Sequence, residues 1–88
     1  MSLMAKQVRL TLQKAIAKAN LRRAKAGEKP ITMNALAVQC DVAATTITRL
    51  ARDPEDPKAA SALSLDLASK ILTVLDCGIR DLLEVIED

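Results

Sequence analysis

Residues 32–52, which read TMNALAVQCDVAATTITRLAR, constrain the fold of this chain more than any other stretch. Small and apolar residues recur there at helical spacing on both sides of a short interruption at Asp41. Ala37 provides the small side chain that two helices need where they cross closely, and Val42 would fill the turn. The stretch therefore predicts two short helices joined by a tight turn.

The second of these helices has two chemically different faces. The apolar face consists of Ala43, Ile47, Leu50 and Ala51. The other face carries Thr45, Thr48, Arg49 and Arg52. The planar fork of arginine can bind both major-groove acceptors of guanine, and threonine offers a hydroxyl and a methyl group, so Arg49 is the first candidate for a base contact. The same residues alone fit equally well an ordinary helical hairpin with two solvated arginines.

A resemblance to a known family favours the first interpretation. Residues 36–50, LAVQCDVAATTITRL, resemble the helix-turn-helix of lambda-repressor and Cro-type (XRE-like) regulators, where a Leu-Ala pair, a turn, a Val and a Thr-Ile-x-Arg run recur in this order. Residues 64–88 look like the last two helices of the compact five-helix form of those domains. The resemblance implies one all-α DNA-binding domain over residues 4–88, with its motif at residues 32–52.

The resemblance also implies a function and a set of DNA contacts. The implied function is that of a sequence-specific transcriptional regulator in the cytoplasm, with double-stranded DNA as its partner. The residues expected to face bases are Ala44, Thr45, Thr48 and Arg49. Those expected to contact phosphates are Thr32, Thr46 and Arg52. Apart from the resemblance, we expect phosphate contacts from Arg22, Arg23 and Lys25, because these basic residues lie near the loop that leads into the motif.

Three departures from the family pattern concern the turn and the second helix. Asp41 occupies a place where the family usually has glycine, because that residue tends to adopt a positive φ. Ala43 and Ala44 stand where a serine or threonine usually caps the second helix. The β-branched run Thr45 to Thr48 favours a strand by local propensity.

The flanking segments are expected to be helical. An apolar stripe of Val8, Leu12, Ala15, Ile16 and Ala19 predicts one long helix from about Ala5 to Ala26, which ends at Gly27 and Pro30. Residues 1–3 look like a cloning remnant ahead of Met4.

Beyond Arg52, the acidic and proline-rich loop DPEDPKAASAL is expected to bend away from DNA. A helix that Ser64 caps, or Asp66 opens, is expected to end at Gly78. Ile79, Leu82, Leu83 and Ile86 then predict a last helix, through which the chain could form a homodimer.

Composition narrows the chemistry. The chain has no histidine and no aromatic residue, and it contains neither a glycine-rich phosphate loop nor a CxxC spacing between Cys40 and Cys77, so we expect no enzyme, no metal and no cofactor. No apolar run is long enough to cross a bilayer. Residues 1–30 hold eight basic side chains against one acid, whereas residues 53–88 hold three against nine. This polarity would turn the basic end towards a polyanion.

A competing hypothesis is a protein-interaction or antitoxin-like module that uses the same scaffold without reading bases. Ala43, Ala44 and the acidic second half support it. A basic exposed face on the second motif helix would favour the regulator, and an acidic or apolar face would favour the adaptor.

Overall fold

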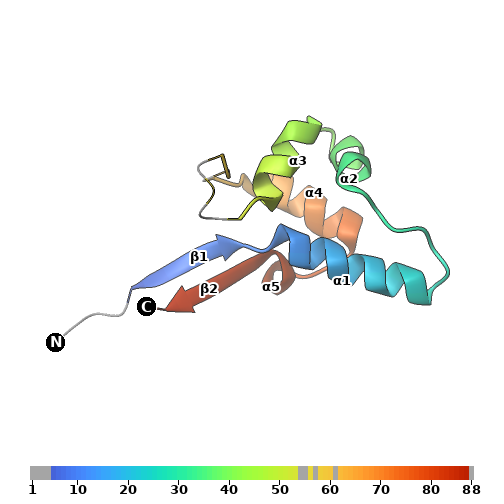
Figure 1. The fold of residues 1–88 in the computed structure, drawn as a ribbon, viewed down its shortest axis with the longest axis horizontal. Coiled ribbons are helices and arrows are strands. Elements are labelled where there is room, and N and C mark those ends of the chain that lie inside the picture. The colour runs from blue at the N-terminus through green and yellow to red at the C-terminus, as the bar shows by residue number, and fades with distance from the viewer. Residues whose placement is uncertain (1–4, 54–55, 57, 61, 88) are drawn as a thin grey trace.

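Five helices and a two-stranded sheet make up the fold in a computed structural model, which describes residues 5–53, 56, 58–60 and 62–87. The predicted cloning remnant lies outside the described residues. In chain order the elements are β1 (Lys6–Leu10), α1 (Leu12–Lys25), α2 (Met33–Gln39), α3 (Ala44–Ala51), α4 (Leu65–Leu75), α5 (Ile79–Leu82) and β2 (Leu83–Glu87). Figure 1 shows α2, α3 and α4 on one side of α1, while the strands project beyond its N-terminal end.

The sheet corrects the expectation of an all-α fold with a long N-terminal helix. β1 and β2 pair antiparallel, with Val8 opposite Val85 and Lys6 opposite Glu87, and Lys6 Nζ lies 3.5 Å from Glu87 Oε1. Residues 7–10 of β1 and 83–85 of β2 alternate apolar with polar or charged side chains, a pattern that suits a strand. Each strand needs the other to form a sheet, and the two lie at opposite ends of the chain, so neither segment alone indicates the sheet. Helix α1 therefore begins only at Leu12, and Val8 of the predicted helical stripe belongs to β1.

The predicted last helix is also wrong beyond its first turn. Helix α5 ends at Leu82, and Leu83 already has extended backbone angles, with φ −126° and ψ 146°. Leu83 and Ile86, which we expected on a helical stripe, lie in β2. The expected homodimer through the last helix therefore lacks its basis, because most of the residues predicted for that helix form β2.

Aliphatic side chains form the core, as the absence of aromatic residues requires. The largest fully buried side chains come from all five helices and the C-terminal end of α2; they are Leu12, Leu36, Cys40, Ile47, Ile71 and Leu82. Burial raises the pKa of the Cys40 thiol, which favours its neutral form. Cys40 and Cys77 are both free thiols.

The ends of α1 and α4 follow from cap residues. Gly27, with φ +74°, follows α1 and meets the prediction that this helix stops there. Ser64 caps α4, because its Oγ accepts a hydrogen bond of 3.0 Å from the Leu67 N–H. α4 ends three residues before the expected Gly78, because Asp76 adopts the left-handed conformation at φ 51°.

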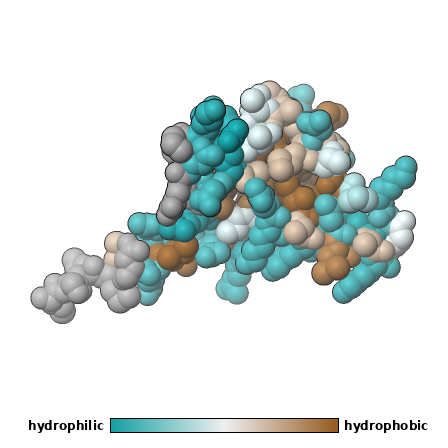
Figure 2. All heavy atoms as spheres, viewed as in Figure 1, coloured by the Kyte–Doolittle hydropathy of each residue, from teal (hydrophilic) through white to brown (hydrophobic). Residues whose placement is uncertain are grey.

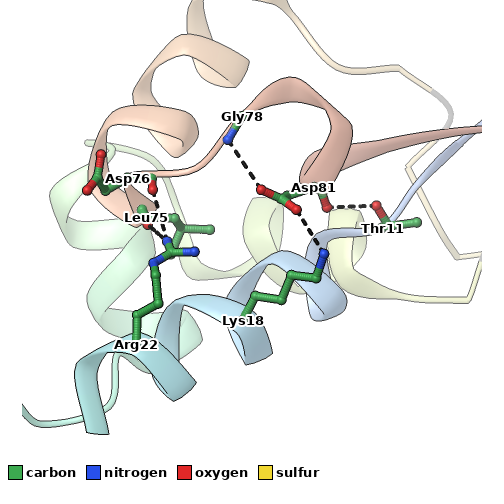
Figure 3. Close-up of polar contacts among 7 residues, drawn as sticks. All are labelled: Thr11, Lys18, Arg22, Leu75, Asp76, Gly78 and Asp81. Atoms are coloured by element: carbon green, nitrogen blue, oxygen red, sulfur yellow. Dashed lines mark hydrogen bonds and ion pairs between the residues drawn. The ribbon is translucent and has the colours of Figure 1, made fainter. Parts of the chain in front are cut away.

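Polar contacts fasten α1 to the C-terminal third of the chain (Figure 3). Thr11 donates its backbone N–H to the Leu82 carbonyl at 2.8 Å and its hydroxyl to the Asp81 carbonyl at 2.9 Å. Lys18 Nζ lies 3.1 Å from Asp81 Oδ1, and the other carboxylate oxygen accepts the Gly78 N–H at 3.3 Å. These contacts hold α1 against α5.

Candidate nucleic-acid interface

The predicted two-helix motif is present as α2 and α3, and its turn has the expected geometry. Asp41 adopts φ 57°, the left-handed conformation expected at the position where the family has glycine. The Val42 N–H donates to the Ala37 carbonyl at 3.0 Å, which closes the turn. The half-buried Val42 packs against the core, as a turn-filling residue should.

Thr32 caps the first motif helix. Its Oγ1 accepts a hydrogen bond of 3.0 Å from the Ala35 N–H, and its backbone is extended. The same hydroxyl keeps its own proton for donation, so the cap is compatible with the predicted phosphate contact.

Asn20 positions the segment that leads into α2. Its side-chain amide donates to the Ile31 carbonyl at 3.1 Å and accepts from the Ile31 N–H at 2.7 Å. Gln13, also on α1, donates to the carbonyl of Ala51 at the C-terminal end of α3 at 2.6 Å. Sequence reasoning missed both residues, because nothing local to either position marks its distant backbone partner.

Helix α3 forms without a side-chain cap, as its two alanines predicted. Ala43 occupies the N-cap position and makes no side-chain hydrogen bond there. Burial explains why the β-branched run nevertheless coils: Ile47, Leu50 and Ala51 are buried, and together they anchor one face of the helix to the core. Thr48 donates its hydroxyl proton to the Ala44 carbonyl at 3.0 Å, so this donor is already used within the helix and the Thr48 oxygen can only accept a further hydrogen bond.

The four predicted base-contacting residues share one exposed face of α3. Ala44, Thr45, Thr48 and Arg49 are all exposed, and the half-buried Thr46 lies at the margin of that face. Arg49 donates Nε–H to the Lys58 carbonyl at 3.3 Å, and its own carbonyl accepts the Ala60 N–H at 3.1 Å. The α3–α4 loop thus braces Arg49 at the end of the exposed face.

Arg52 is engaged within the protein. Its Nη1 lies 3.1 Å from Asp56 Oδ2, and its Nε is buried without a hydrogen-bond partner among the described residues. The hydrogen bond from the Lys58 backbone N–H lowers the pKa of the Asp56 carboxyl below its usual value, and the hydrogen bond and charge of Arg52 lower it further. The predicted phosphate contact of Arg52 would therefore have to share or replace this ion pair.

The three basic residues near the end of α1 have different environments. Arg22 donates through Nη2 to the carbonyls of Leu75 and Asp76 at 2.7 and 2.9 Å, which satisfies the C-terminal end of α4 (Figure 3). Arg23 donates to the Lys29 carbonyl at 3.4 Å, and Lys25 is exposed. Lys25 is thus the least engaged of the three predicted phosphate contacts.

No group of three or more metal-ligating side chains was found in the described part of the chain. None of the described helices combines the length and apolar character needed to cross a membrane.

Comparison with known families agrees with this architecture. The model of the Cro/C1-type helix-turn-helix DNA-binding domain matches residues 20–88, which include α2 and α3 of the motif together with α4, α5 and β2. The match begins inside α1, so β1 lies outside it. Comparisons with curated proteins and with solved structures returned no significant match. The chain belongs to the Cro/C1-type helix-turn-helix DNA-binding family, which indicates DNA binding and a role in transcription regulation.

Proposed function

We propose that this protein is a sequence-specific cytoplasmic regulator that lays α3 in the major groove of double-stranded DNA. The observation that carries this proposal is the division of α3 into two faces. Ile47, Leu50 and Ala51 hold the helix to the core, while the opposite face remains exposed and offers hydroxyl groups and a guanidinium. Such groups can hydrogen-bond to base edges.

The proposed contacts divide into reading and positioning. Ala44, Thr45, Thr48 and Arg49 read bases, with Arg49 taking guanine. Arg49 can keep the loop bond through Nε while Nη1 and Nη2 point to the base. The residues proposed to contact phosphates are Thr32, Thr46, Arg52, Arg22, Arg23 and Lys25.

The adaptor hypothesis receives less support from the same helix. An adaptor surface would present acidic or apolar residues, whereas the exposed face of α3 contains Arg49 and no acid. Ala44 and the missing cap remain the features that fit an adaptor. Binding to a protein in place of DNA, with the exposed face of α3 at the interface, would support it.

Arg49 gives the most specific test of base reading. Arg49→Ala should cost about 1 to 3 kcal/mol of DNA-binding free energy and relax the preference at one base pair, because a two-pronged contact with guanine is lost. The measurement is competition binding against duplexes that differ at single positions.

Arg49→Lys is the matched control, because lysine keeps the charge but loses the planar fork. We expect it to retain non-specific affinity and to lose the same base preference. An equal loss of affinity by Arg49→Ala on every sequence would make Arg49 a phosphate contact instead.

A further inference from the structure

The α3–α4 loop lies beside the exposed face of α3, at the end of the helix that carries Arg49. Four residues line a hollow of about 240 Å³ between them: Thr46 and Arg49 of α3, and Ala60 and Ala62 of the loop. Figure 2 shows hydrophilic residues gathered where the loop meets α3. The loop is therefore close enough to α3 to influence the direction of the Arg49 side chain.

Asp56 joins this loop to α3 through both oxygens of its carboxylate. Oδ2 lies 3.1 Å from Nη1 of Arg52, the C-cap residue of α3. Oδ1 accepts a hydrogen bond of 2.8 Å from the Lys58 N–H. One carboxylate thus connects the end of α3 to the residue whose carbonyl accepts the Arg49 Nε–H.

The direction of the Arg49 guanidinium depends on where Lys58 lies. The bond from Arg49 Nε to the Lys58 carbonyl, 3.3 Å long, restrains the guanidinium and leaves Nη1 and Nη2 for a base. A long side chain that is already restrained loses less conformational entropy when it binds. If Lys58 moved, Arg49 would lose this restraint.

Asp56 also reduces the charge that α3 offers to DNA. Its ion pair offsets the positive charge of Arg52, a predicted phosphate contact, and its own negative charge repels phosphates. The same carboxylate therefore opposes binding to DNA of any sequence while it restrains the residue that reads the sequence. Both effects raise the ratio of specific to non-specific affinity.

We propose that Asp56 is a specificity-determining residue of the DNA interface, which positions Arg49 through Lys58 and keeps Arg52 from phosphate. Asp56 acts through these residues and makes no contact with DNA itself. The inference rests on the proposed function, because it concerns how α3 reads bases.

Two variants of Asp56 separate its two effects. Asp56→Asn keeps an oxygen that can accept the Lys58 N–H but loses the charge that holds Arg52. Its affinity for non-specific duplexes should rise about threefold, and the salt slope of binding should steepen by about 0.9 as Arg52 gains a phosphate. Its preference for guanine at the Arg49 position should stay within about twofold of the wild type.

Asp56→Ala loses both contacts, so its non-specific affinity should also rise while its preference for guanine falls about fivefold or more. Competition binding on duplexes that differ at single positions measures both quantities. A role in stability alone would weaken binding to all duplexes. That result in either variant, or an unchanged preference for guanine in Asp56→Ala, would overturn the proposal.

Lys58→Ala is the matched control, because Lys58 contributes only its backbone to these contacts. It should keep the guanine preference within about twofold of the wild type. Adding Arg52→Gln to Asp56→Asn should cancel the gain in non-specific affinity. A gain that persists in the double variant would contradict the role of Arg52.

A measurement without DNA separates this inference from the proposed function. Exchange of the Arg49 Nε–H with water, followed by NMR in the free protein, should be slow in the wild type and in Lys58→Ala and faster in Asp56→Ala. Equal exchange in all three proteins would overturn the positioning of Arg49 by Asp56. A wild type that binds all duplexes alike would contradict DNA reading by α3, and the exchange rates alone would then decide whether Asp56 positions Arg49.

Discussion

Backbone conformation at single residues decides where the motif turns. The resemblance predicted a positive φ at Asp41, and the structure has 57° there. The same conformation at Asp76 was not predicted, because Gly78 was the expected end of α4. Aspartate tolerates this region better than most residues, so a left-handed Asp gives a weaker sequence signal than a glycine does.

The two aspartates predict a pair of stability measurements. The Asp41→Gly variant should have a free energy of unfolding about 1 kcal/mol higher than the Asp41→Ala variant, because alanine carries a Cβ that the left-handed region penalises. Asp76→Gly and Asp76→Ala should differ in the same direction. Urea denaturation checks both pairs, and a glycine variant that is no more stable than its alanine counterpart would contradict this interpretation.

The sequence alone could not show whether a basic residue of α1 stabilises the fold or is available to bind DNA. Arg22 and Lys25 both belong to the basic end of α1, yet Arg22 bonds to two carbonyls at the end of α4 while Lys25 is exposed. The partners of Arg22 lie more than fifty residues away in the chain. The exposed face of α3 was predictable, because the helical period alone separates its buried and exposed residues.

The contrast between these two residues is testable. Arg22→Gln should lower the free energy of unfolding by about 1 kcal/mol, since charged hydrogen bonds to helix-end carbonyls are lost. Lys25→Gln should leave stability unchanged and, if Lys25 contacts phosphate, reduce the salt slope of DNA binding by about one. Thermal unfolding and binding at several salt concentrations measure both effects. A destabilised Lys25→Gln, or an Arg22→Gln as stable as the wild type, would contradict the assignment.

At the scale of elements, the helices of the motif and α4 were predictable and the sheet was not. Periodicity and the Ser64 cap are local signals, whereas β1 and β2 stabilise each other across the whole chain. The five residues of β1 also continue the apolar period of α1 through Val8, which made one long helix the simpler prediction. The true boundary lies at Thr11, whose bonds to Asp81 and Leu82 tie the end of β1 to α5.

Asp81 at the start of α5 predicts an acid dependence of stability. The hydrogen bond from Lys18, followed by that from the Gly78 N–H, lowers the pKa of the Asp81 carboxyl from its usual 3.8. The unfolded chain therefore binds the proton more readily, so the stabilisation is complete above about pH 3.8 and is lost as pH falls through the lower folded pKa. Asp56 acts in the same direction.

Denaturation at several pH values tests this dependence. Asp81→Asn should be less stable than the wild type at pH 7, and the difference between the two should shrink below about pH 3.8. Glu28→Gln is a suitable control, because Glu28 is an exposed acid for which no ion pair is present among the described residues. A difference between Asp81→Asn and wild type that stays constant down to pH 2 would contradict the role of the ionised carboxylate.

The whole molecule combines a basic N-terminal third with an acidic C-terminal half, and the fold brings part of the two together. Lys18 pairs with Asp81, and Arg22 satisfies the end of α4. Lys14 and Lys25 make no ion pair among the described residues and keep the basic character of α1. Only the Lys18–Asp81 ion pair offsets a basic charge of α1, because Arg22 bonds to neutral carbonyls and keeps its charge.

A dimer, if the protein forms one on DNA, predicts the spacing of its binding site. Two copies should prefer half-sites one helical turn apart, about 34 Å, because α3 of each copy must enter the major groove on the same side of the duplex. Binding to duplexes with half-sites moved by about 5 base pairs should be weaker. A strictly monomeric protein in sedimentation with DNA would remove this expectation.

Selection from random duplex DNA, repeated across salt concentrations, tests the central claim most directly. We predict an enriched sequence motif that persists as salt rises and that includes a guanine whose selection disappears in Arg49→Ala. Recovery of no motif, with binding that only weakens with salt at a slope near −0.9 per neutralised phosphate, would show that α3 adheres to DNA without reading it.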